Sequence, residues 1–459
     1  MKSDIIIIGG GASGLMAGYA AADALVEAGA APSVAVLEKM PRPGRKIMIT
    51  GKGRCNFSNI KDWNEFSLHI RTNSSFVKQS FFNLSSRAMQ EFLESYGLKT
   101  VVERGDRAFP QSHRASDVVD TLVNACLSRG VKMETECEIV SISHNGDGFA
   151  LEAADGRKYA CRRLIIATGG LSYPSSGSSG DGYAWASALG HSIKQCLPSL
   201  TALVPKGYKD PSGIVSSGMK GHIDRSSPLS EVGKALCGIQ LKNVGLSLCI
   251  DGKEVDSVFG DVDFTDGGIE GPAGFQLSRK AVKAIFNGSK VSLRLDLKSG
   301  VPAEDISRRV NELWDEIRKD PRSERLREKE KCRILLGKLM PWDLIPGFVM
   351  CNPRIMNTLS ITRGGARTVL MPSEVARALK DWAFDLAGYV GYERAVVTAG
   401  GVNTDEVIPK TMESRLVPGL YFCGEVLDID SDTGGYNLQT AFSTGCLAGR
   451  SAAKSILRT

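Results

Sequence analysis

Three glycines near the start of the chain have the spacing that lets a backbone approach phosphate groups. Gly9-x-Gly11-x-x-Gly14 follows the apolar run Asp4 to Ile8 and precedes an alanine-rich stretch. In this pattern the first glycine makes a tight turn, the second leaves room for a pyrophosphate, and the third lets helix and strand pack closely. Glu38 ends the next apolar run, where a carboxylate accepts hydrogen bonds from ribose hydroxyls and repels a 2′-phosphate. These residues predict a dinucleotide site that disfavours NADP.

The elements that must position this glycine fingerprint can be predicted from the local pattern. The β-branched run from Asp4 to Ile8 indicates a strand buried on both faces. An alanine-rich helix follows and ends near Gly29, and Val34 to Leu37 indicates a second strand. Strand, helix and strand form a βαβ unit that presents the helix N-terminus to a pyrophosphate.

Three further segments favour FAD over NAD. Gly44 to Asn56 is a loop rich in glycine and cations, which suits a long anionic cofactor. Ala167 to Gly170 follows a predicted buried strand, Arg163 to Ala167, and so lies at its carboxyl end, where open α/β sheets bind ligands. Leu420 to Asn437 reads strand, acid, glycine pair and helix start. There a carboxylate, from Glu425 or Asp428, can bind ribityl hydroxyls, and the helix can direct its positive end at the N1/O2 edge of a flavin.

At these segments the chain resembles the bacterial NAD(P)/FAD-dependent oxidoreductases, also described as aminoacetone oxidase-like, a family that includes a bile-acid reductase. The matching stretches run from residue 5 to about residue 445: GGGASGLMAG, GRKIMITGKGRCNFSN, IIATGGLSYPSSGSSGDGYAWASALGH, FTDGGIEGP, TAGGV and PKTMESRLVPGLYFCGEVLDIDSDTGGYNLQTAFSTG. The resemblance implies an α/β fold: a discontinuous, glutathione-reductase-like FAD-binding Rossmann domain with an inserted β-barrel and a small helical domain. It also implies FAD as the cofactor, with Asn56, Thr168, Gly169, Glu425, Gly435, Tyr436 and Asn437 along it. The three segments around Gly11, Thr168 and Gly435 predict that this FAD is bound non-covalently.

The residues expected to bind the cofactor come from the fingerprint, the cationic loop, the two strand ends and their neighbours. They are Gly9, Gly11, Ala12, Ser13, Gly14, Glu38, Lys39, Gly44, Arg45, Lys46, Arg54, Cys55, Asn56, Cys137, Ala167, Thr168, Gly169, Gly170, Gly424, Glu425, Asp428, Gly434, Gly435, Tyr436, Asn437 and Leu438. Cys55 is either a thiol near the flavin or an inert buried thiol. Tyr436 is either a proton donor beside the flavin or a packing residue. No catalytic residue is identified.

One stretch departs from the family pattern. Relatives commonly read F-T-H-x-G-x-S-G-P where this chain reads FTDGGIEGP, so Asp266 replaces the histidine and Glu270 replaces the serine. An activity that used that histidine would not transfer to this chain.

Composition and element order bound the remaining possibilities. Eleven scattered cysteines without a C-x-x-C and five histidines predict neither a disulfide framework nor a metal site, and they suit a cytoplasmic protein. The N-terminal apolar run is too short for a signal sequence or a membrane span. The element order predicts a first part of the FAD domain at 1–197, a β-rich insertion at 198–300, a helical domain at 301–350 and a returning FAD segment at 351–459.

The leading hypothesis is an enzyme that transfers a hydride between FAD and a small organic substrate. The alternatives are a flavin-dependent tRNA-modifying protein and a non-catalytic FAD-binding protein. No nucleic-acid partner is expected, because the net charge of +6 is diffuse. The chain has one strand-anchored fingerprint, so NAD(P)H is expected only as a transient donor, and reduction of the flavin by the substrate is favoured. Substrate, electron donor and acceptor, and oligomeric state are not predicted.

Overall fold

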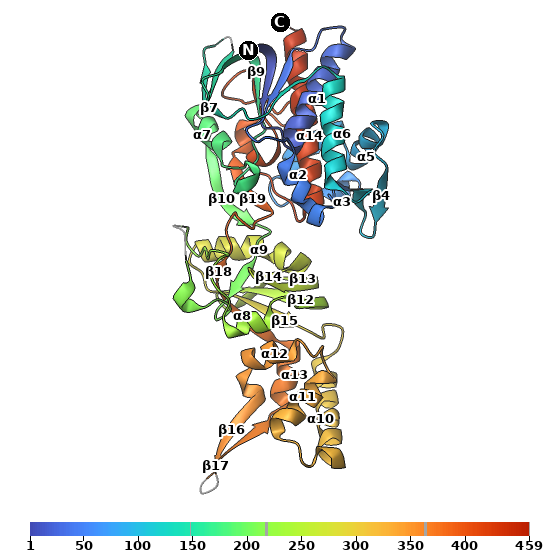
Figure 1. Ribbon diagram of the computed structural model, residues 1–459, viewed down its shortest axis with the longest axis vertical. Helices are drawn as coiled ribbons and strands as arrows, with labels where there is room; N and C mark the ends of the chain where they lie inside the picture. Colours follow the sequence, from blue (N-terminus) through green and yellow to red (C-terminus); the bar gives the residue numbers. More distant parts are fainter. Residues whose placement is uncertain (147, 216–218, 362–364, 459) are drawn as a thin grey trace. The chain divides into compact units, whose positions relative to one another are not determined.

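The computed structural model describes residues 1–146, 148–215, 219–361 and 365–458. It forms two compact units, one made of Met1–Ser199 with Ala395–Thr459 and the other of Leu200–Arg394 (Figure 1). Along the chain, the second unit therefore interrupts the first. The chain re-enters the first unit at Ala395 rather than at 351, because the strand at Trp382–Tyr389 belongs to the second unit.

A mainly parallel sheet forms the centre of the first unit. Its strand order is β6-β2-β1-β9-β8-β7, and β20 also pairs with β9. The strands that run parallel are β1 (Lys2–Ile8), β2 (Val34–Leu37), β6 (Lys132–Glu134), β9 (Lys158–Ile166) and β20 (Leu420–Phe422). The two antiparallel strands are β7 (Ile139–His144) and β8 (Phe149–Ala153). β9 begins earlier than the sequence predicts, because its first residues pair with β8.

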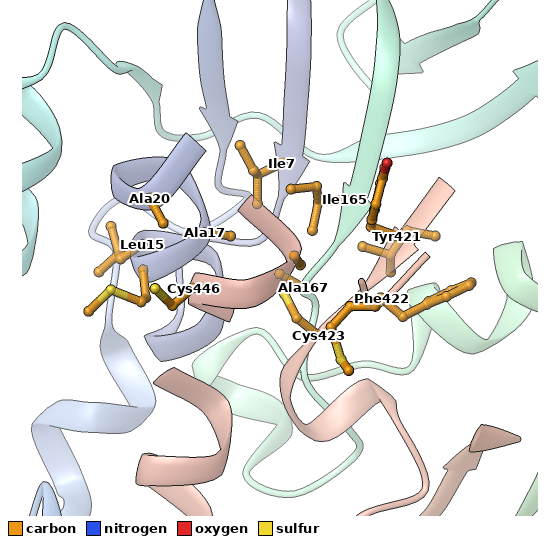
Figure 2. Close-up of a cluster of buried hydrophobic side chains, with 14 of the residues drawn as sticks. Ile7, Leu15, Ala17, Ala20, Ile165, Ala167, Tyr421, Phe422, Cys423 and Cys446 are labelled. Carbon is orange, nitrogen blue, oxygen red and sulfur yellow. The ribbon is translucent and has the colours of Figure 1, made fainter. Parts of the chain in front are cut away.

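Two long helices pack on each other beside this sheet. They are α1 (Ala12–Glu27) and α14 (Gly434–Leu457), which lie next to each other in Figure 1. A Cβ at Gly445 would collide with the carbonyl oxygen of Ser13, and one at Gly449 with that of Ala17. The two glycines thus allow the helix backbones to touch. Figure 2 shows the apolar core around Leu15, Ala17, Ile165 and Phe422.

The rest of the first unit consists of shorter elements. They are α2 (Arg45–Ile49), β3 (Ser58–Asn59), α3 (Trp63–Ser67), α4 (Ser74–Asn83), α5 (Ser86–Ser95), β4 (Thr100–Glu103), β5 (Arg107–Pro110), α6 (Ala115–Ser128), α7 (Asp181–Ala188), β10 (Ile193–Ser199) and β19 (Val397–Val402). β3, β5 and β4 form a three-stranded sheet, and β10 pairs with β19.

The second unit contains a closed barrel, which confirms the inserted β-barrel expected from the sequence. Its strand order is β11-β14-β13-β12-β15-β18, and β18 pairs back onto β11. The strands are β11 (Leu203–Pro205), β12 (Gln240–Ile250), β13 (Lys253–Thr265), β14 (Gly268–Glu270), β15 (Val291–Asp296) and β18 (Trp382–Tyr389). Trp382 is fully buried against Phe264, Phe348 and Phe384.

Helices and one hairpin complete the second unit. They are α8 (Glu231–Leu236), α9 (Gly271–Phe286), α10 (Ala303–Lys319), α11 (Glu328–Gly337), α12 (Ile345–Cys351), α13 (Pro372–Lys380), β16 (Met356–Ile361) and β17 (Gly365–Leu370). α10 buries one apolar stripe, which includes Val310 and Leu313, and exposes its charged residues. No helix in the described part of the chain is both long and apolar enough to cross a membrane.

Candidate functional site

The three fingerprint glycines have distinct surroundings at the end of β1. Gly9 has φ of 102°, and a Cβ there would lie 2.5 Å from the Ala167 carbonyl oxygen. A Cβ on Gly14 would collide with the Gly9 carbonyl oxygen, so this glycine permits the close approach of α1 to β1. A Cβ on Gly11 would meet no protein atom within 4 Å. The space beside Gly11 is therefore open, which fits a pyrophosphate at the N-terminus of α1.

Glu38 lies at the end of β2 with its carboxylate turned toward the glycine loop. Its two oxygens accept the backbone N–H groups of Gly10 at 2.6 Å and Met40 at 2.8 Å. Burial raises the pKa of Glu38, and these two hydrogen bonds oppose the rise. The backbone N–H of Cys137 donates to the Glu38 carbonyl at 2.9 Å, so the predicted residues Glu38 and Cys137 are brought together. Lys39, next in the chain, forms an ion pair with Asp181 at 2.7 Å.

A second group of predicted residues is joined by a polar network at the carboxyl ends of β9 and β20. Lys46 lies 3.0 Å from Glu425 Oε2 and donates to Ser172 Oγ at 2.9 Å. Glu425 Oε1 accepts hydrogen bonds from Ser172 Oγ and from the backbone N–H of Thr398, both at 2.8 Å. A Cβ at Gly170 would lie 2.5 Å from Thr398 Oγ1, so this glycine brings the strand-end loop against the network. The arrangement holds the Glu425 carboxylate in one orientation.

The loop before α14 is fixed by the Asn437 side chain. Its amide accepts the Ser431 N–H at 3.0 Å and donates to the carbonyls of Ser431 at 3.0 Å and Thr433 at 2.8 Å. α14 begins at Gly434, three residues earlier than predicted. A Cβ on Gly434 would meet nothing within 4 Å, whereas one on Gly435 would collide with the side chain of Asn59. The helix N-terminus is thus open at Gly434 and closely packed one residue later.

Three buried hydroxyls near these segments lack a hydrogen-bond partner among the described residues: Thr168 Oγ1, Ser431 Oγ and Thr440 Oγ1. A buried hydroxyl without a partner is costly. Together with the open space at Gly11 and Gly434, these hydroxyls fit a large polar cofactor that supplies the missing partners. The residues present therefore fit FAD.

Some predicted residues have other contacts. Arg54 forms an ion pair with Glu103, and its guanidinium carbon lies 4.3 Å from the centre of the Phe109 ring. Cys55 is fully buried, and burial raises its pKa to about 12, which describes an inert thiol. Arg45 is exposed. The described residues contain no group of three or more His, Cys, Asp or Glu side chains that could hold a metal ion.

Sequence reasoning missed Ser172 and Thr398, which complete the network around Glu425. Ser172 is a small polar residue in a serine-rich loop and Thr398 is buried in β19, so neither stood out in the sequence. Ser172 lies 253 residues before Glu425 in the chain. Thr398 accepts the N–H of Leu171, which lies 227 residues earlier. Contacts between residues so far apart leave no local pattern in the sequence.

The chain matches the family model described as the HI0933-like protein Rossmann domain over residues 3–451. The chain belongs to the HI0933-like family. The FAD-binding Rossmann fold and the family resemblance expected from the sequence are thereby confirmed, and FAD is the cofactor of this chain. The chain is an FAD-dependent oxidoreductase.

Three relatives match nearly the full length of this HI0933-like chain. The 3-dehydro-bile acid delta(4,6)-reductase of Clostridium scindens is 32% identical over 453 residues, which cover 98% of this chain and 98% of that protein. The ribosomal RNA dihydrouridine synthase of Escherichia coli is 30% identical over 457 residues, 99% of each chain. The synthase of the same name from Haemophilus influenzae is 28% identical over 449 residues, 96% of each chain.

The residues that depart from the usual family motif form ion pairs in the second unit. Asp266 pairs with Arg225 at 2.8 Å and with Arg394 at 3.1 Å, and Glu270 pairs with Arg394 as well. Burial opposes ionisation of Asp266, but the hydrogen bond from Arg225 and the charge of Arg394 outweigh it and lower its pKa. The ammonium group of Lys209 donates to the carbonyls of Arg225, Ser227 and Asp266. A carboxylate held ionised in this way cannot donate a proton near neutral pH, unlike a histidine.

Proposed function

We propose that this chain reduces a carbon–carbon double bond conjugated to a carbonyl group in a small organic molecule, using FAD. The similarity to the bile-acid reductase over 98% of both chains carries this proposal. The name of that relative specifies double bonds in a 3-oxo steroid. A dihydrouridine synthase saturates the C5=C6 bond of uracil, which is conjugated to the C4 carbonyl. Both chemistries add a hydride and a proton across a polarised double bond.

The residues of the first unit have separable roles in this proposal. FAD, when bound, would serve as the two-electron carrier and supply the hydride for the substrate. Gly11 and the start of α1 leave room for its pyrophosphate, and Glu38 offers its carboxylate oxygens to ribose hydroxyls. The N-terminus of α14 places a positive dipole end where a reduced flavin gathers negative charge.

An anaerobic acceptor screen tests the proposal. The protein is purified with FAD, reduced with dithionite, and mixed with 3-oxo-Δ4 steroids, simple cyclic enones and matched saturated ketones. We expect reoxidation of the flavin, measured by absorbance, only with the conjugated acceptors, and a product two hydrogens heavier by mass spectrometry. Reoxidation by none of the conjugated acceptors contradicts the proposal, as does protein that cannot be loaded with FAD.

Reduction of uracil in RNA is the second candidate, and the names of two full-length relatives favour it. The charge pattern disfavours RNA binding. Basic residues such as Arg308, Arg309 and Arg327 in the helical part of the second unit form ion pairs with neighbouring acidic residues and do not form a concentrated basic patch. Incubation of the reduced protein with ribosomal RNA, followed by nucleoside mass spectrometry, separates the candidates. Dihydrouridine formation without enone reduction would replace the first candidate by the second.

A further inference from the structure

A histidine–carboxylate pair lies beside the start of α14, outside the residues predicted from the sequence. His69 Nδ1 is 2.9 Å from Asp432 Oδ2. The second oxygen of Asp432 accepts a hydrogen bond from Arg71, and only 7% of the Asp432 side chain is exposed. The carboxylate is therefore held from both sides, and it fixes the orientation of the imidazole.

The backbone on both sides of this pair is fastened as well. The Arg71 N–H donates to the Asp430 carbonyl at 2.8 Å, and the Asp432 N–H donates to the His69 carbonyl at 3.0 Å. Thr72 Oγ1 donates to Asp430 Oδ1 at 2.8 Å. These bonds join the segment after α3 to the loop that leads into α14. His69 is thus positioned by the same loop that Asn437 fixes.

The imidazole stacks on Tyr436, one of the residues that the family resemblance implies along the flavin. The two ring centres are 4.1 Å apart with an angle of 16° between the planes. Tyr436 is buried, and burial raises its pKa to about 12, so its hydroxyl is a poor acid near neutral pH. His69 keeps 35% of its side chain exposed. In the described part of the chain, Nε2 of His69 has no hydrogen-bond partner.

We propose that His69, oriented by Asp432, is the catalytic acid that protonates the substrate during reduction. The pair has the geometry of a general acid: one ring nitrogen fixed by a carboxylate and the other directed away from it. This inference rests on the proposed function. The substrate double bond accepts a hydride from reduced FAD at the carbon β to the carbonyl, and a proton from His69 Nε2 at the α carbon. FAD is left oxidised, and the imidazole regains a proton from water.

The test compares His69→Asn with a matched control, His144→Asn. An asparagine at 69 can still donate to Asp432 but has no group in the place of Nε2. His144 lies on β7 against Phe149, with its ring centre 4.8 Å from that ring, and has no part in the proposed site. We expect His69→Asn to bind FAD normally and to slow flavin reoxidation by the enone about 10²–10⁴-fold, the usual contribution of a general acid. His144→Asn should react at the wild-type rate.

The pH profile supplies a readout that a structural role would not move. The charged or titratable groups that face His69 are Asp432 and Tyr436, and Arg71 lies on the other side of the Asp432 carboxylate. The charges of Lys61, Glu65 and Asp106 influence the pKa of Tyr436. The wild-type rate should depend on pH through the group that donates the proton to the substrate, and His69→Asn should lack this dependence. A wild-type profile or rate in His69→Asn overturns the inference.

Nitrogen NMR of the five histidines gives a readout that does not depend on turnover. In wild-type protein, FAD loading should shift the His69 imidazole resonances and leave those of His144 in place. Unchanged His69 resonances would show that the pair is remote from the cofactor, and would overturn the inference.

If the wild type reduces no conjugated acceptor, the proposed function fails, and the protonation step fails with it. If the wild type reacts and His69→Asn reacts equally fast, only the role of His69 fails.

Discussion

At the scale of single residues, two fingerprint glycines have different roles. A side chain at Gly11 would point into open space in the protein, whereas one at Gly14 would strike the backbone of Gly9. The first position matters for the ligand and the second for the fold. Substitutions at the two positions should therefore separate cofactor binding from stability.

We predict that Gly11→Val abolishes FAD binding while the apo protein unfolds close to the wild-type temperature, because the added side chain fills the space expected for pyrophosphate. Gly14→Ala should lower the unfolding temperature of the apo protein, since α1 must move away from β1. Flavin fluorescence titration and thermal denaturation check both effects. Normal FAD affinity in Gly11→Val would mean that the fingerprint has been misinterpreted.

Glu38 makes the stability of the apo protein depend on pH. Burial raises its folded pKa above the usual carboxyl value, in spite of the bonds from Met40 and Gly10. The folded state then binds more protons than the unfolded state between the two pKa values, so this contribution to stability is present at low pH and is lost as pH rises through the folded pKa. We predict that the stability of Glu38→Gln does not fall in this way as the pH rises. Urea unfolding of both proteins from pH 4 to pH 8 measures it, and identical pH slopes would contradict it.

At the scale of elements, the contact of α1 with α14 depends on two glycines four residues apart. A Cβ at Gly445 or Gly449 would collide with the backbone of α1, and helix separation would open the core shown in Figure 2. We predict that Gly445→Ala destabilises the protein by about 1–3 kcal/mol, the usual cost of overpacking. Gly434→Ala in the same helix is the control for stability, because its side chain would meet nothing within 4 Å. Equal unfolding free energies for the two variants would contradict the helix contact.

The elements that carry the glycine fingerprint were predictable because each of them has a local pattern. The strand Val34–Leu37 is continuous and apolar, and the glycine fingerprint marks the start of α1. β18 was missed, although Trp382 to Tyr389 bury alternate residues, because the composition around it suggested a return of the FAD domain.

Glu425 was predicted from its place after β20, but its contact with Lys46 spans 379 residues. No local pattern encodes such a pairing. The same holds for His69 and Asp432.

At the scale of the whole molecule, the described strands of the second unit form a barrel and a hairpin rather than a second Rossmann domain. Flavoenzymes of the glutathione-reductase type keep a separate Rossmann domain for NAD(P)H. We predict that NADH and NADPH reduce the flavin slowly, without saturation at micromolar concentration. Anaerobic stopped-flow absorbance checks this. Fast, saturable reduction at micromolar NAD(P)H would instead demonstrate a dedicated nicotinamide site.

The closure of the barrel by β18 onto β11 has a consequence for protein synthesis. All barrel strands leave the ribosome before β20 and α14, which complete the sheet and the helix pair of the first unit. The inserted unit can therefore fold on the nascent chain while the flanking unit still lacks its last strand and helix. Glu425, Asp432 and Gly434 are translated after the whole inserted unit, so a nascent chain lacks its complete cofactor site while that unit folds. Flavin capture should accordingly follow the folding of the inserted unit and not precede it.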